Sequence, residues 1–271
     1  MQAYRGMDIG TAKPEAGLRA SLPHHLVDIL EPSELYSVGD FVRRAGEAVA
    51  AIRARGRLPI VSGGTGFYVK HLVGGLPTAP AADPALRAEV ARDLEARGVE
   101  ALRAELASGD PVSAARIHER DLYRLSRALE ILRATGRPLA DFLPAGGGEG
   151  WQVIEYRRPR EELRSRIALR VDGMFEAGLP AEVARLREAG FGAGDPGMKA
   201  IGYSEFFELE ADGLSGEGLL VAARARIKAD SQKYAKRQET FFKGLPGRLV
   251  LEAKEGGPEG LAEILRPWLE R

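Results

Sequence analysis

The sequence predicts an α/β protein whose parallel-sheet core is interrupted by an all-helical domain. Apolar runs that end near residues 29 and 61 are each followed by a helical pattern, which is the sequence form of a parallel sheet with crossover helices. Residues 79–148 show helical patterns alone, between a proline-rich link and a glycine-rich link. We therefore expect a core formed by residues 1–78 and 149–271, with residues 79–148 as an inserted domain.

The first part of the core contains two predicted strands, each followed by a helix. Residues 24–29 are a short apolar run typical of a buried strand. Ser37 is a suitable N-cap for the next helix, which carries an apolar stripe and ends at Gly56. Residues 58–61 predict the second strand, and residues 67–72 predict a helix behind a glycine loop.

The inserted block reads as helices separated by short turns. The helical patterns cover residues 85–97, residues 99–108, a short stretch after Pro111 and residues 121–135. Leucines at helical spacing line the last of these helices, which Gly136 closes, and a glycine run at residues 146–150 predicts a hinge.

The second part of the core returns to the α/β pattern. Residues 151–156 are rich in β-branched and aromatic side chains and predict a strand. A helix with an apolar stripe follows at residues 160–177, and the longest helix covers residues 216–242. Residues 248–251 predict an edge strand and residues 257–269 a closing helix.

Composition excludes several classes of site. The 271 residues include 39 Lys and Arg, 39 Asp and Glu, and no cysteine, which excludes a disulfide, a thiolate metal site or a cysteine nucleophile. Because the net charge is zero, a nucleic-acid surface would require local segregation of charge. No apolar run is long enough to span a membrane and no signal peptide is visible, so we expect a cytoplasmic soluble protein.

Residues 1–14 lack apolar periodicity and are rich in groups that suit a phosphate. The segment contains two glycines, two cations and a hydroxyl, namely Gly6, Gly10, Arg5, Lys13 and Thr11. Such a loop lets its backbone approach a polar ligand closely. A frayed terminus explains the same composition, and we also expect the complete pattern to include residues upstream of this segment.

Two further segments could bind an anion. Residues 62–66, Ser-Gly-Gly-Thr-Gly, form a glycine loop after a predicted strand, where ligands bind in parallel sheets, although a tight turn without a ligand has the same sequence. Arg166 and Arg170 lie one turn apart on a predicted helix, so both guanidinium groups can face one diphosphate. A solvated helix face is the alternative for this pair.

The long helix near the C-terminus has the strongest local positive charge. Seven cations fall within twenty residues, with three aromatic side chains between them: Arg224, Arg226, Lys228, Lys233, Lys236, Arg237 and Lys243, with Tyr234, Phe241 and Phe242. Cations neutralise phosphates and aromatic rings stack on unpaired bases, although basic surface helices are common. The sequence has no carboxylates at metal-ligand spacing and no phosphate-loop motif of the G-x-x-x-x-G-K-[ST] type.

Taken together, these segments resemble the tRNA dimethylallyltransferase (tRNA isopentenyltransferase) family. The matching strings occur in family order over nearly the whole chain: residues 2–14, residues 23–28 (Pro-His-His-Leu-Val-Asp), residues 61–66, residues 115–118 (Ala-Arg-Ile-His), residues 124–130, residues 200–203 (Ala-Ile-Gly-Tyr) and residues 235–238 (Ala-Lys-Arg-Gln). The first string and the glycine loop are the most specific.

This resemblance implies an activity and a fold. The dimethylallyl group of dimethylallyl diphosphate would pass to N6 of the adenine just 3′ of the tRNA anticodon (position 37), and diphosphate would leave with the assistance of Mg²⁺. The implied fold is a P-loop-type α/β core with an inserted helical domain that holds the anticodon stem-loop, and the base would be flipped into a channel. The implied protein is a monomer that does not associate with membranes.

The resemblance also assigns roles to residues of this sequence. It implies that Arg170 and Thr65 serve catalysis and that Arg170 and Arg166 hold the diphosphate. The residues expected to contact tRNA are Met1, Gln2, Thr65, Arg87, Tyr123, Arg124, Leu125, Ser126, Arg127, Lys199, Gly202, Tyr203, Lys236, Arg237, Gln238 and Lys243.

The sequence departs from the family pattern at its start. Met1 and Gln2 match the end of an Asp-Ser-x-Gln element, whose aspartate is the family's general base, and the first strand and the P-loop also precede this point. We therefore expect an N-terminally truncated member of the family. Two alternatives stay open, a catalytically dead tRNA-binding remnant and a relative of the P-loop nucleotide kinases.

Overall fold

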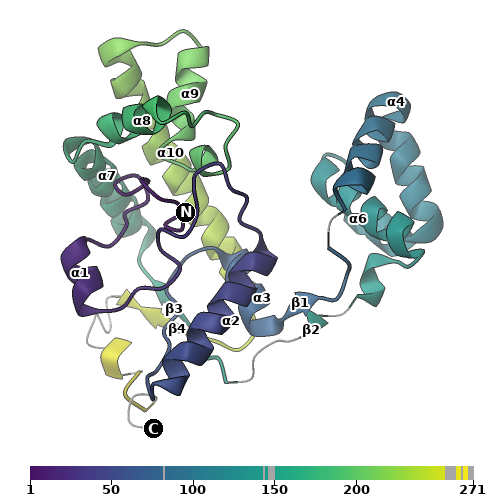
Figure 1. Cartoon of the computed structure of the whole chain (residues 1–271), viewed down its shortest axis with the longest axis horizontal. Helices are drawn as coiled ribbons and strands as arrows, with labels where there is room; N and C mark the ends of the chain where they lie inside the picture. The colour runs from purple at the N-terminus through teal and green to yellow at the C-terminus, as the bar shows by residue number, and fades with distance from the viewer. Residues whose placement is uncertain (82, 143, 146–149, 254–260, 264, 268–271) are drawn as a thin grey trace. The chain divides into compact units, whose positions relative to one another are not determined.

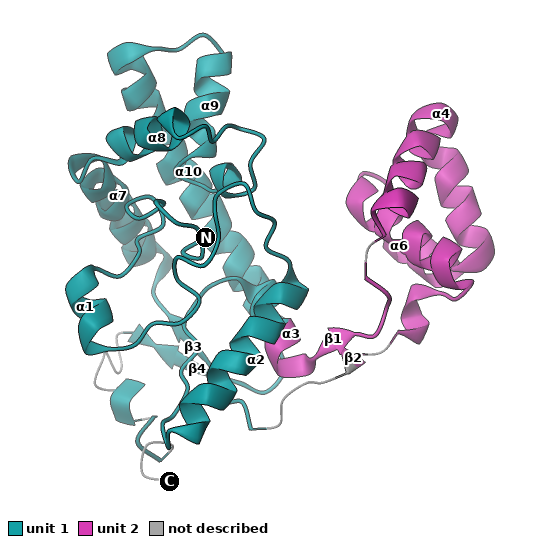
Figure 2. Ribbon diagram, in the orientation of Figure 1, with its two compact units in different colours: residues 1–70, 150–271 teal, residues 71–149 magenta. Residues whose placement is uncertain are grey.

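A computed structural model describes residues 1–81, 83–142, 144–145, 150–253, 261–263 and 265–267. The chain divides into two compact units (Figure 2): unit 1 contains residues 1–70 and 150–271, and unit 2 contains residues 71–149. The sequence places the corresponding insert at residues 79–148. Most of the described elements are helices, and unit 1 holds a small parallel sheet, so the α/β class is confirmed.

Unit 1 combines a small sheet with several helices (Figure 1). Strands β3 (Val153–Arg157) and β4 (Arg248–Glu252) pair in parallel, with Val153 opposite Arg248. The helices of this unit are α1 (Ala16–Ser21), α2 (Val38–Ala54), α7 (Arg160–Glu176), α8 (Leu179–Glu188), the 3-10 turn η2 (Gly197–Lys199), α9 (Ser204–Ala211) and α10 (Gly216–Lys243). Both strands were expected at these positions, as were the long helices α7 and α10.

Local capping signals fix the ends of α2. Ser37 accepts a hydrogen bond from the backbone N–H of Asp40, and the Asp40 carboxylate accepts one from the backbone N–H of Ser37. This capping box satisfies two backbone donors that the first turn leaves without helical partners. At the other end Gly56 has a φ of +66°, which favours glycine, so the predicted helix boundaries are confirmed.

The core of unit 1 joins the first residues of the chain to the later helices. The loop formed by residues 1–14 contributes Tyr4 and the fully buried Met7. These side chains pack with residues of α7, α8, α9 and α10, among them Val171, Leu179, Val183, Met198, Phe206, Ala223 and Ile227. The N-terminal loop is therefore part of the folded core, which excludes the interpretation as a frayed terminus.

Two expected strands are wrong. In residues 24–29 the backbones of Leu26 and Asp28 have φ values of +62° and +55°, which a strand residue does not adopt. The end of this segment runs beside the N-terminal loop, to which the backbone N–H groups of Asp28 and Ile29 donate hydrogen bonds. Among the described residues the only β-bridge there is the parallel one between Tyr4 and Leu30. Residues 58–61 are likewise not assigned to a strand, because they form no ladder with any described segment.

Unit 2 is a helical bundle with a short strand pair at its base. Its helices are the two-part α4 (Pro84–Gly109), which breaks at Gly98, α5 (Pro111–Arg116) and α6 (Leu122–Thr135), followed by the 3-10 turn η1 (Leu139–Asp141). Strands β1 (Leu76–Pro77) and β2 (Pro144–Ala145) pair antiparallel. The helix α3 (Gly66–Gly74) begins in unit 1 and ends in unit 2.

The core of unit 2 forms where α4, α5 and α6 meet. Val90, Leu102, Leu106 and Leu129 are fully buried there, and Leu125 is 1% exposed. The helices expected in this block are confirmed, including the break between residues 97 and 99, where Gly98 has a φ of +78°. The glycine hinge lies largely outside the described residues, as does much of the closing helix, of which residues 261–263 and 265–267 are helical.

Candidate substrate pocket and nucleic-acid contacts

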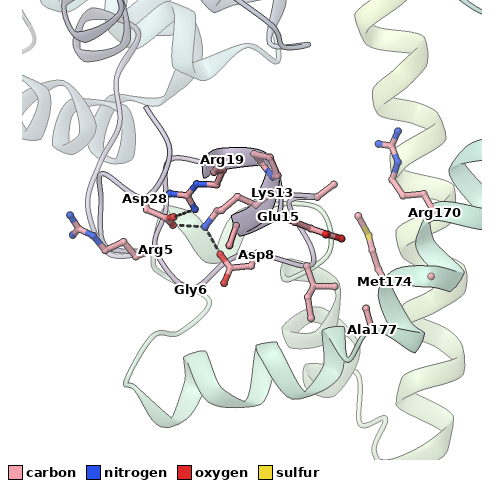
Figure 3. Close-up of a pocket in the computed structure, with 15 residues that line it drawn as sticks. Arg5, Gly6, Asp8, Lys13, Glu15, Arg19, Asp28, Arg170, Met174 and Ala177 are labelled. Carbon is pink, nitrogen blue, oxygen red and sulfur yellow. Dashed lines mark hydrogen bonds and ion pairs between the residues drawn. The ribbon is translucent and has the colours of Figure 1, made fainter. Parts of the chain in front are cut away.

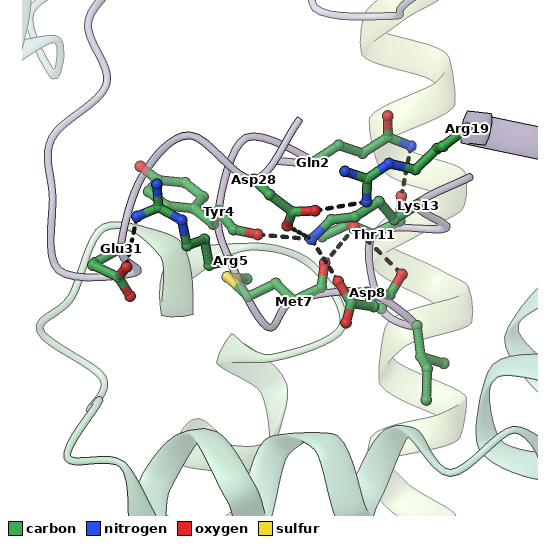
Figure 4. Close-up of polar contacts among 12 residues, drawn as sticks. Gln2, Tyr4, Arg5, Met7, Asp8, Thr11, Lys13, Arg19, Asp28 and Glu31 are labelled. Carbon is green, nitrogen blue, oxygen red and sulfur yellow. Dashed lines mark hydrogen bonds and ion pairs between the residues drawn. The ribbon is translucent and has the colours of Figure 1, made fainter. Parts of the chain in front are cut away.

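The first fourteen residues fold into a loop that its own side chains close (Figure 4). The side-chain amide of Gln2 donates hydrogen bonds to the carbonyl oxygens of Thr11 at 3.2 Å and Ala12 at 2.9 Å. The ammonium group of Lys13 donates to the carbonyl oxygen of Tyr4 at 2.9 Å. The two ends of the segment are thereby joined, which fixes Gln2, one of the expected tRNA contacts.

Lys13 connects this loop to the next segment of the chain. Its side chain is 3% exposed and lies between the carboxylates of Asp8 at 2.5 Å and Asp28 at 2.6 Å. Asp28 also accepts a hydrogen bond from Arg19 at 2.7 Å. Burial opposes the charge on the Asp28 carboxyl, but the hydrogen bonds from Lys13 and Arg19 outweigh it and hold its pKa below the usual value.

A cavity of about 790 Å³ lies between this loop and α7 (Figure 3). The loop and α1 supply one wall, with Ile9, Lys13 and Arg19 among its residues. The end of α7 supplies the other wall through Arg170, Gly173, Met174 and Ala177. A volume of this size suits a small molecule, and the wall combines charged groups with apolar atoms.

Arg170 differs from the other cations of this cavity. Lys13 and Arg19 are paired with Asp28, and Arg5 is paired with Glu31 at 2.7 Å. Arg170 has no carboxylate within 4.0 Å and no hydrogen bond in the described part of the chain. Its guanidinium is therefore available to an anionic ligand, which it can bind with two parallel hydrogen bonds.

Two other expected site residues, Arg166 for the diphosphate and Thr65 for catalysis, lie outside the lining of this cavity. Arg166 is one turn from Arg170 on α7, and its guanidinium lies 3.8 Å from the carboxylate of Glu162. Thr65 is exposed and directly precedes α3, where its carbonyl oxygen accepts the backbone N–H of Tyr68 at 2.9 Å. The roles given to these two residues stay predictions.

A buried carboxylate on α8 fastens the N-terminal loop. Glu182 is fully buried and accepts hydrogen bonds from the backbone N–H groups of Asp8, Ile9 and Gly10 at 2.9–3.1 Å. It also accepts the hydroxyl of Tyr203 at 2.6 Å. The sequence gives no local signal for this role, because Glu182 looks like any other glutamate in a helix.

The glycine loop at residues 62–66 packs against α10. The side-chain amide of Gln238 donates to the carbonyl oxygen of Gly64 at 2.8 Å, and a side chain at Gly66 would collide with the ring of Phe241. The expected tRNA contacts Lys236, Arg237 and Lys243 on the same helix are exposed, with Lys243 paired to Glu239 at 2.8 Å. Lys199 is also exposed, whereas Gly202 and Tyr203 are buried beneath the N-terminal loop.

Unit 2 presents some of the expected tRNA contacts and buries others. Tyr123 is 76% exposed and the side chain of Arg124 is 73% exposed, while Leu125 lies in the core with its side chain inaccessible. Arg127 and Arg87 donate to the two oxygens of the buried Glu130 at 3.0 Å and 3.1 Å. Ser126 is half-buried beside them. Tyr123 and Arg124 are therefore the residues of this helix that an RNA could reach directly.

The sequence matches one family model over most of its length. The model for IPP transferase covers residues 2–245, which includes the N-terminal loop, the glycine loop, α7 and α10. The chain belongs to the IPP transferase family.

Curated relatives support this assignment to the IPP transferase family. A protein named tRNA dimethylallyltransferase from Geobacter sulfurreducens is 42% identical over 250 residues, which are 91% of this chain and 79% of that protein. A protein of the same name from Methylibium petroleiphilum is also 42% identical, over 97% of this chain and 81% of its own length.

Solved structures of IPP transferases have the same fold. The full-length tRNA isopentenylpyrophosphate transferase from Bacillus halodurans superimposes with a TM-score of 0.68 at 36% identity, and the match covers 98% of this chain and 83% of that one. A eukaryotic dimethylallyltransferase acting on tRNA gives a TM-score of 0.73 at 25% identity, over 93% of this chain and 65% of that one.

The described residues of this IPP transferase do not form a metal centre of their own. No three His, Asp or Glu side chains in that part of the chain converge as ligands. Of the carboxylates that line the cavity, Asp8 and Asp28 are paired with Lys13, and Glu15 is the third. The described helices are also too short or too polar to cross a lipid bilayer.

Proposed function

We propose that this chain transfers a dimethylallyl group from dimethylallyl diphosphate to N6 of the adenosine just 3′ of the anticodon in tRNA. The observation that carries the proposal is the cavity beside α7, where Arg170 has no ionic partner among the described residues and faces a wall that combines polar and apolar atoms. An isoprenoid diphosphate matches this combination, and the relatives named tRNA dimethylallyltransferase support tRNA as the acceptor.

The reaction exchanges one bond for another. The bond between carbon 1 of the dimethylallyl group and a diphosphate oxygen breaks, a bond between that carbon and N6 forms, and N6 loses one proton. Arg170 stabilises the negative charge that develops on the leaving diphosphate, because a guanidinium can hold two of its oxygens at once. Met174 and Ala177 supply apolar atoms for the prenyl chain. The family pattern assigns the general base to the aspartate of the Asp-Ser-x-Gln element, which is not among the residues numbered here.

Both units supply surfaces for RNA in this proposal. In unit 1 the exposed cations Lys199, Lys236 and Arg237 would neutralise phosphates, and in unit 2 Arg124 would do so beside the exposed ring of Tyr123. Aromatic rings stack on bases that leave the helical stack, as a flipped adenine must. We also propose that the sheet of unit 1 is of the P-loop type, and that the protein acts as a cytoplasmic monomer.

Mg²⁺ belongs to the proposal only through the substrate. The described residues offer no cluster of carboxylates for a resident ion. Diphosphate oxygens are among the ligands that Mg²⁺ prefers, so an ion would arrive with the diphosphate, and no step derived above depends on it.

The proposal is tested by incubating the chain with radiolabelled dimethylallyl diphosphate and an anticodon stem-loop RNA. We expect label in the RNA, and none when the adenosine is replaced by guanosine. Salt-sensitive RNA binding without transfer would instead support the tRNA-binding remnant. Transfer of phosphate from ATP to a nucleotide would support the kinase alternative, which the names of the relatives do not favour.

A further inference from the structure

The carboxylate of Glu182 is the most completely buried charged group in unit 1 that the proposed reaction does not use. It lies on α8, fully inaccessible, and no Lys, Arg or His side chain of the described residues pairs with it. A buried carboxylate without a cation is unfavourable unless hydrogen-bond donors surround it. The surroundings of Glu182 must therefore hold several donors in place.

Four donors surround this carboxylate, and three of them come from consecutive residues of the N-terminal loop. The backbone N–H groups of Asp8, Ile9 and Gly10 point to its two oxygens at 2.9–3.1 Å. Consecutive N–H groups of this kind form a concave anion site. The fourth donor is the phenol of Tyr203 at 2.6 Å, and burial together with this hydrogen bond raises the pKa of Tyr203, so the phenol stays protonated and donates.

Close packing fixes the same loop on the segment that begins α9. A Cβ atom at Gly10 would lie 2.6 Å from the ring of Tyr203, and the Cβ of a side chain at Gly202 would lie 3.5 Å from the carbonyl oxygen of Gly10. Gly202 has a φ of +101°, which requires glycine. Glu182 therefore joins α8, the start of α9 and the N-terminal loop at one point.

We propose that Glu182 is a positioning residue, which holds the N-terminal loop in the conformation that binds tRNA. The inference rests on the proposed function and extends it to a residue that touches neither substrate. Glu182 fixes the backbone at Asp8–Gly10, and the adjoining carbonyl oxygens of Thr11 and Ala12 hold the side chain of Gln2. Arg170 stands on α7, across the cavity, and makes no hydrogen bond or ion pair with this loop among the described residues.

Positioning of the loop and a general contribution of Glu182 to stability predict different effects on kcat and on the two KM values. If Glu182 only stabilised the fold, its loss would reduce the folded fraction and hence kcat, and would leave the KM values of both substrates unchanged. If it positions the loop, the KM for tRNA rises more than the KM for dimethylallyl diphosphate. The loop supplies one wall of the cavity, but Arg170, which holds the diphosphate, stands on the opposite wall.

The decisive variant is Glu182→Gln, compared with Glu188→Gln on the exposed side of the same helix. Glutamine has nearly the same shape, but its side-chain NH₂ group cannot accept the hydrogen bonds that the backbone N–H groups of residues 8–10 donate. Its remaining oxygen accepts them without a charge. We expect the KM for the stem-loop RNA to rise by about tenfold or more, the effect of losing charge-assisted hydrogen bonds. We expect the KM for dimethylallyl diphosphate to change by less than about threefold, and Glu188→Gln to match the wild type.

Amide hydrogen exchange tests whether the N-terminal loop is held in place, and it does not require an active enzyme. In Glu182→Gln the amides of residues 8–10 should exchange faster than in the wild type, while those of the α8 and α10 cores should not. If the variant does not fold, Gly10→Ala displaces the loop from Tyr203 while leaving Glu182 intact, and the same rise in the KM for RNA is expected.

The outcomes separate this inference from the proposed function. Unchanged KM values and unchanged exchange at residues 8–10 would overturn the positioning role, as would a fall in kcat alone. If the wild-type chain transfers no dimethylallyl group, the proposed function fails, and the exchange comparison still decides whether Glu182 orders the loop.

Discussion

The side-chain amide of Gln238 lies 2.8 Å from the carbonyl oxygen of Gly64 and donates a hydrogen bond to it. This contact joins the basic helix α10 to the glycine loop at residues 62–66, two segments that are distant in sequence and are both expected to contact tRNA. A Cβ atom at Gly64 would meet the side-chain amide of Gln238, and one at Gly66 would meet the ring of Phe241. The glycines are thus needed for close approach of backbone to helix.

The two glycines should respond differently to a methyl group. A Cβ at Gly64 meets only the flexible end of Gln238, whereas a Cβ at Gly66 meets the ring of Phe241. We predict that Gly66→Ala lowers the free energy of unfolding by about 1–3 kcal/mol and that Gly64→Ala lowers it by less. Urea unfolding of both variants measures this difference. An equal loss would show that the ring of Phe241 moves as easily as the amide.

Arg170 should control the use of the diphosphate substrate. We predict that Arg170→Ala lowers kcat/KM for dimethylallyl diphosphate by about a hundredfold or more, because no other cation of the cavity lacks an ionic partner in the described structure. Arg170→Lys should recover only part of the activity, since an ammonium group lacks the planar fork. Arg164→Ala removes an exposed arginine from the same helix and serves as the control. Comparable losses at both positions would contradict the role of Arg170.

Replacement of Arg124 should affect RNA binding, whereas replacement of Arg127 should affect the stability of unit 2. Arg124 is 73% exposed, so Arg124→Ala should weaken RNA binding, reduce its salt dependence and leave stability almost unchanged. Arg127 donates to Glu130, whose side chain is 3% exposed, so Arg127→Ala should lower the free energy of unfolding of unit 2 by about 1–3 kcal/mol. Filter binding at two salt concentrations measures RNA binding and its salt dependence, and thermal unfolding measures stability. A destabilised Arg124→Ala variant would contradict this assignment.

Unit 2 should lose stability in acid through Arg133. Its guanidinium contacts Glu89, Asp93 and Glu105 at 2.7–2.8 Å, and its hydrogen bonds hold the pKa values of Asp93 and Glu105 below their usual values. Because these pKa values are lower in the folded state than in the unfolded state, their contribution is present at neutral pH and is lost as the pH falls through the folded values.

We therefore predict that Arg133→Met narrows the difference in stability of unit 2 between about pH 6 and pH 3. Amide hydrogen exchange of α4 and α6, compared after incubation at each of the two pH values, measures the stability of unit 2. Arg116→Met, which removes an exposed arginine from α5, should leave the difference unchanged. If unit 2 of Arg133→Met loses as much stability in acid as unit 2 of the wild type, carboxylates other than those of Asp93 and Glu105 dominate the loss.

Elements with local signals could be predicted from the sequence. Ser37 and Gly56 bound α2, and Gly98 and Gly136 mark a break and an end among the helices of unit 2. Each signal acts within a few residues, so neighbouring sequence suffices to read it. The strands β3 and β4 were also predicted, β3 from its β-branched and aromatic residues, but their pairing with each other was not.

The two strands that were predicted wrongly would need partners that a local pattern does not contain. The apolar run at residues 58–61 resembles a buried strand, yet Ile60 is 63% exposed, because no described segment forms a ladder beside it. In residues 24–29 the carboxylate of Asp28 is bonded to Lys13 and Arg19, and the backbone there is left-handed.

Local sequence patterns also leave out the tertiary contacts of the candidate site. Arg170 and the N-terminal loop were identified as possible anion sites from their own residues, and the family resemblance gave Arg170 its role. That they lie on opposite walls of one cavity depends on the tertiary structure. Glu182 was missed altogether, since its backbone partners at residues 8–10 lie more than 170 residues earlier in the chain.

The most direct test of the account is analysis of nucleosides by mass spectrometry after the chain has acted on an anticodon stem-loop RNA with dimethylallyl diphosphate. We predict that the adenosine just 3′ of the anticodon carries one dimethylallyl group in place of a hydrogen on N6, with one diphosphate released for each group transferred. The product should form about a hundredfold more slowly, or slower still, with Arg170→Ala and at the wild-type rate with Arg164→Ala. An unmodified adenosine, from folded chain that binds the RNA, would contradict the proposed transfer.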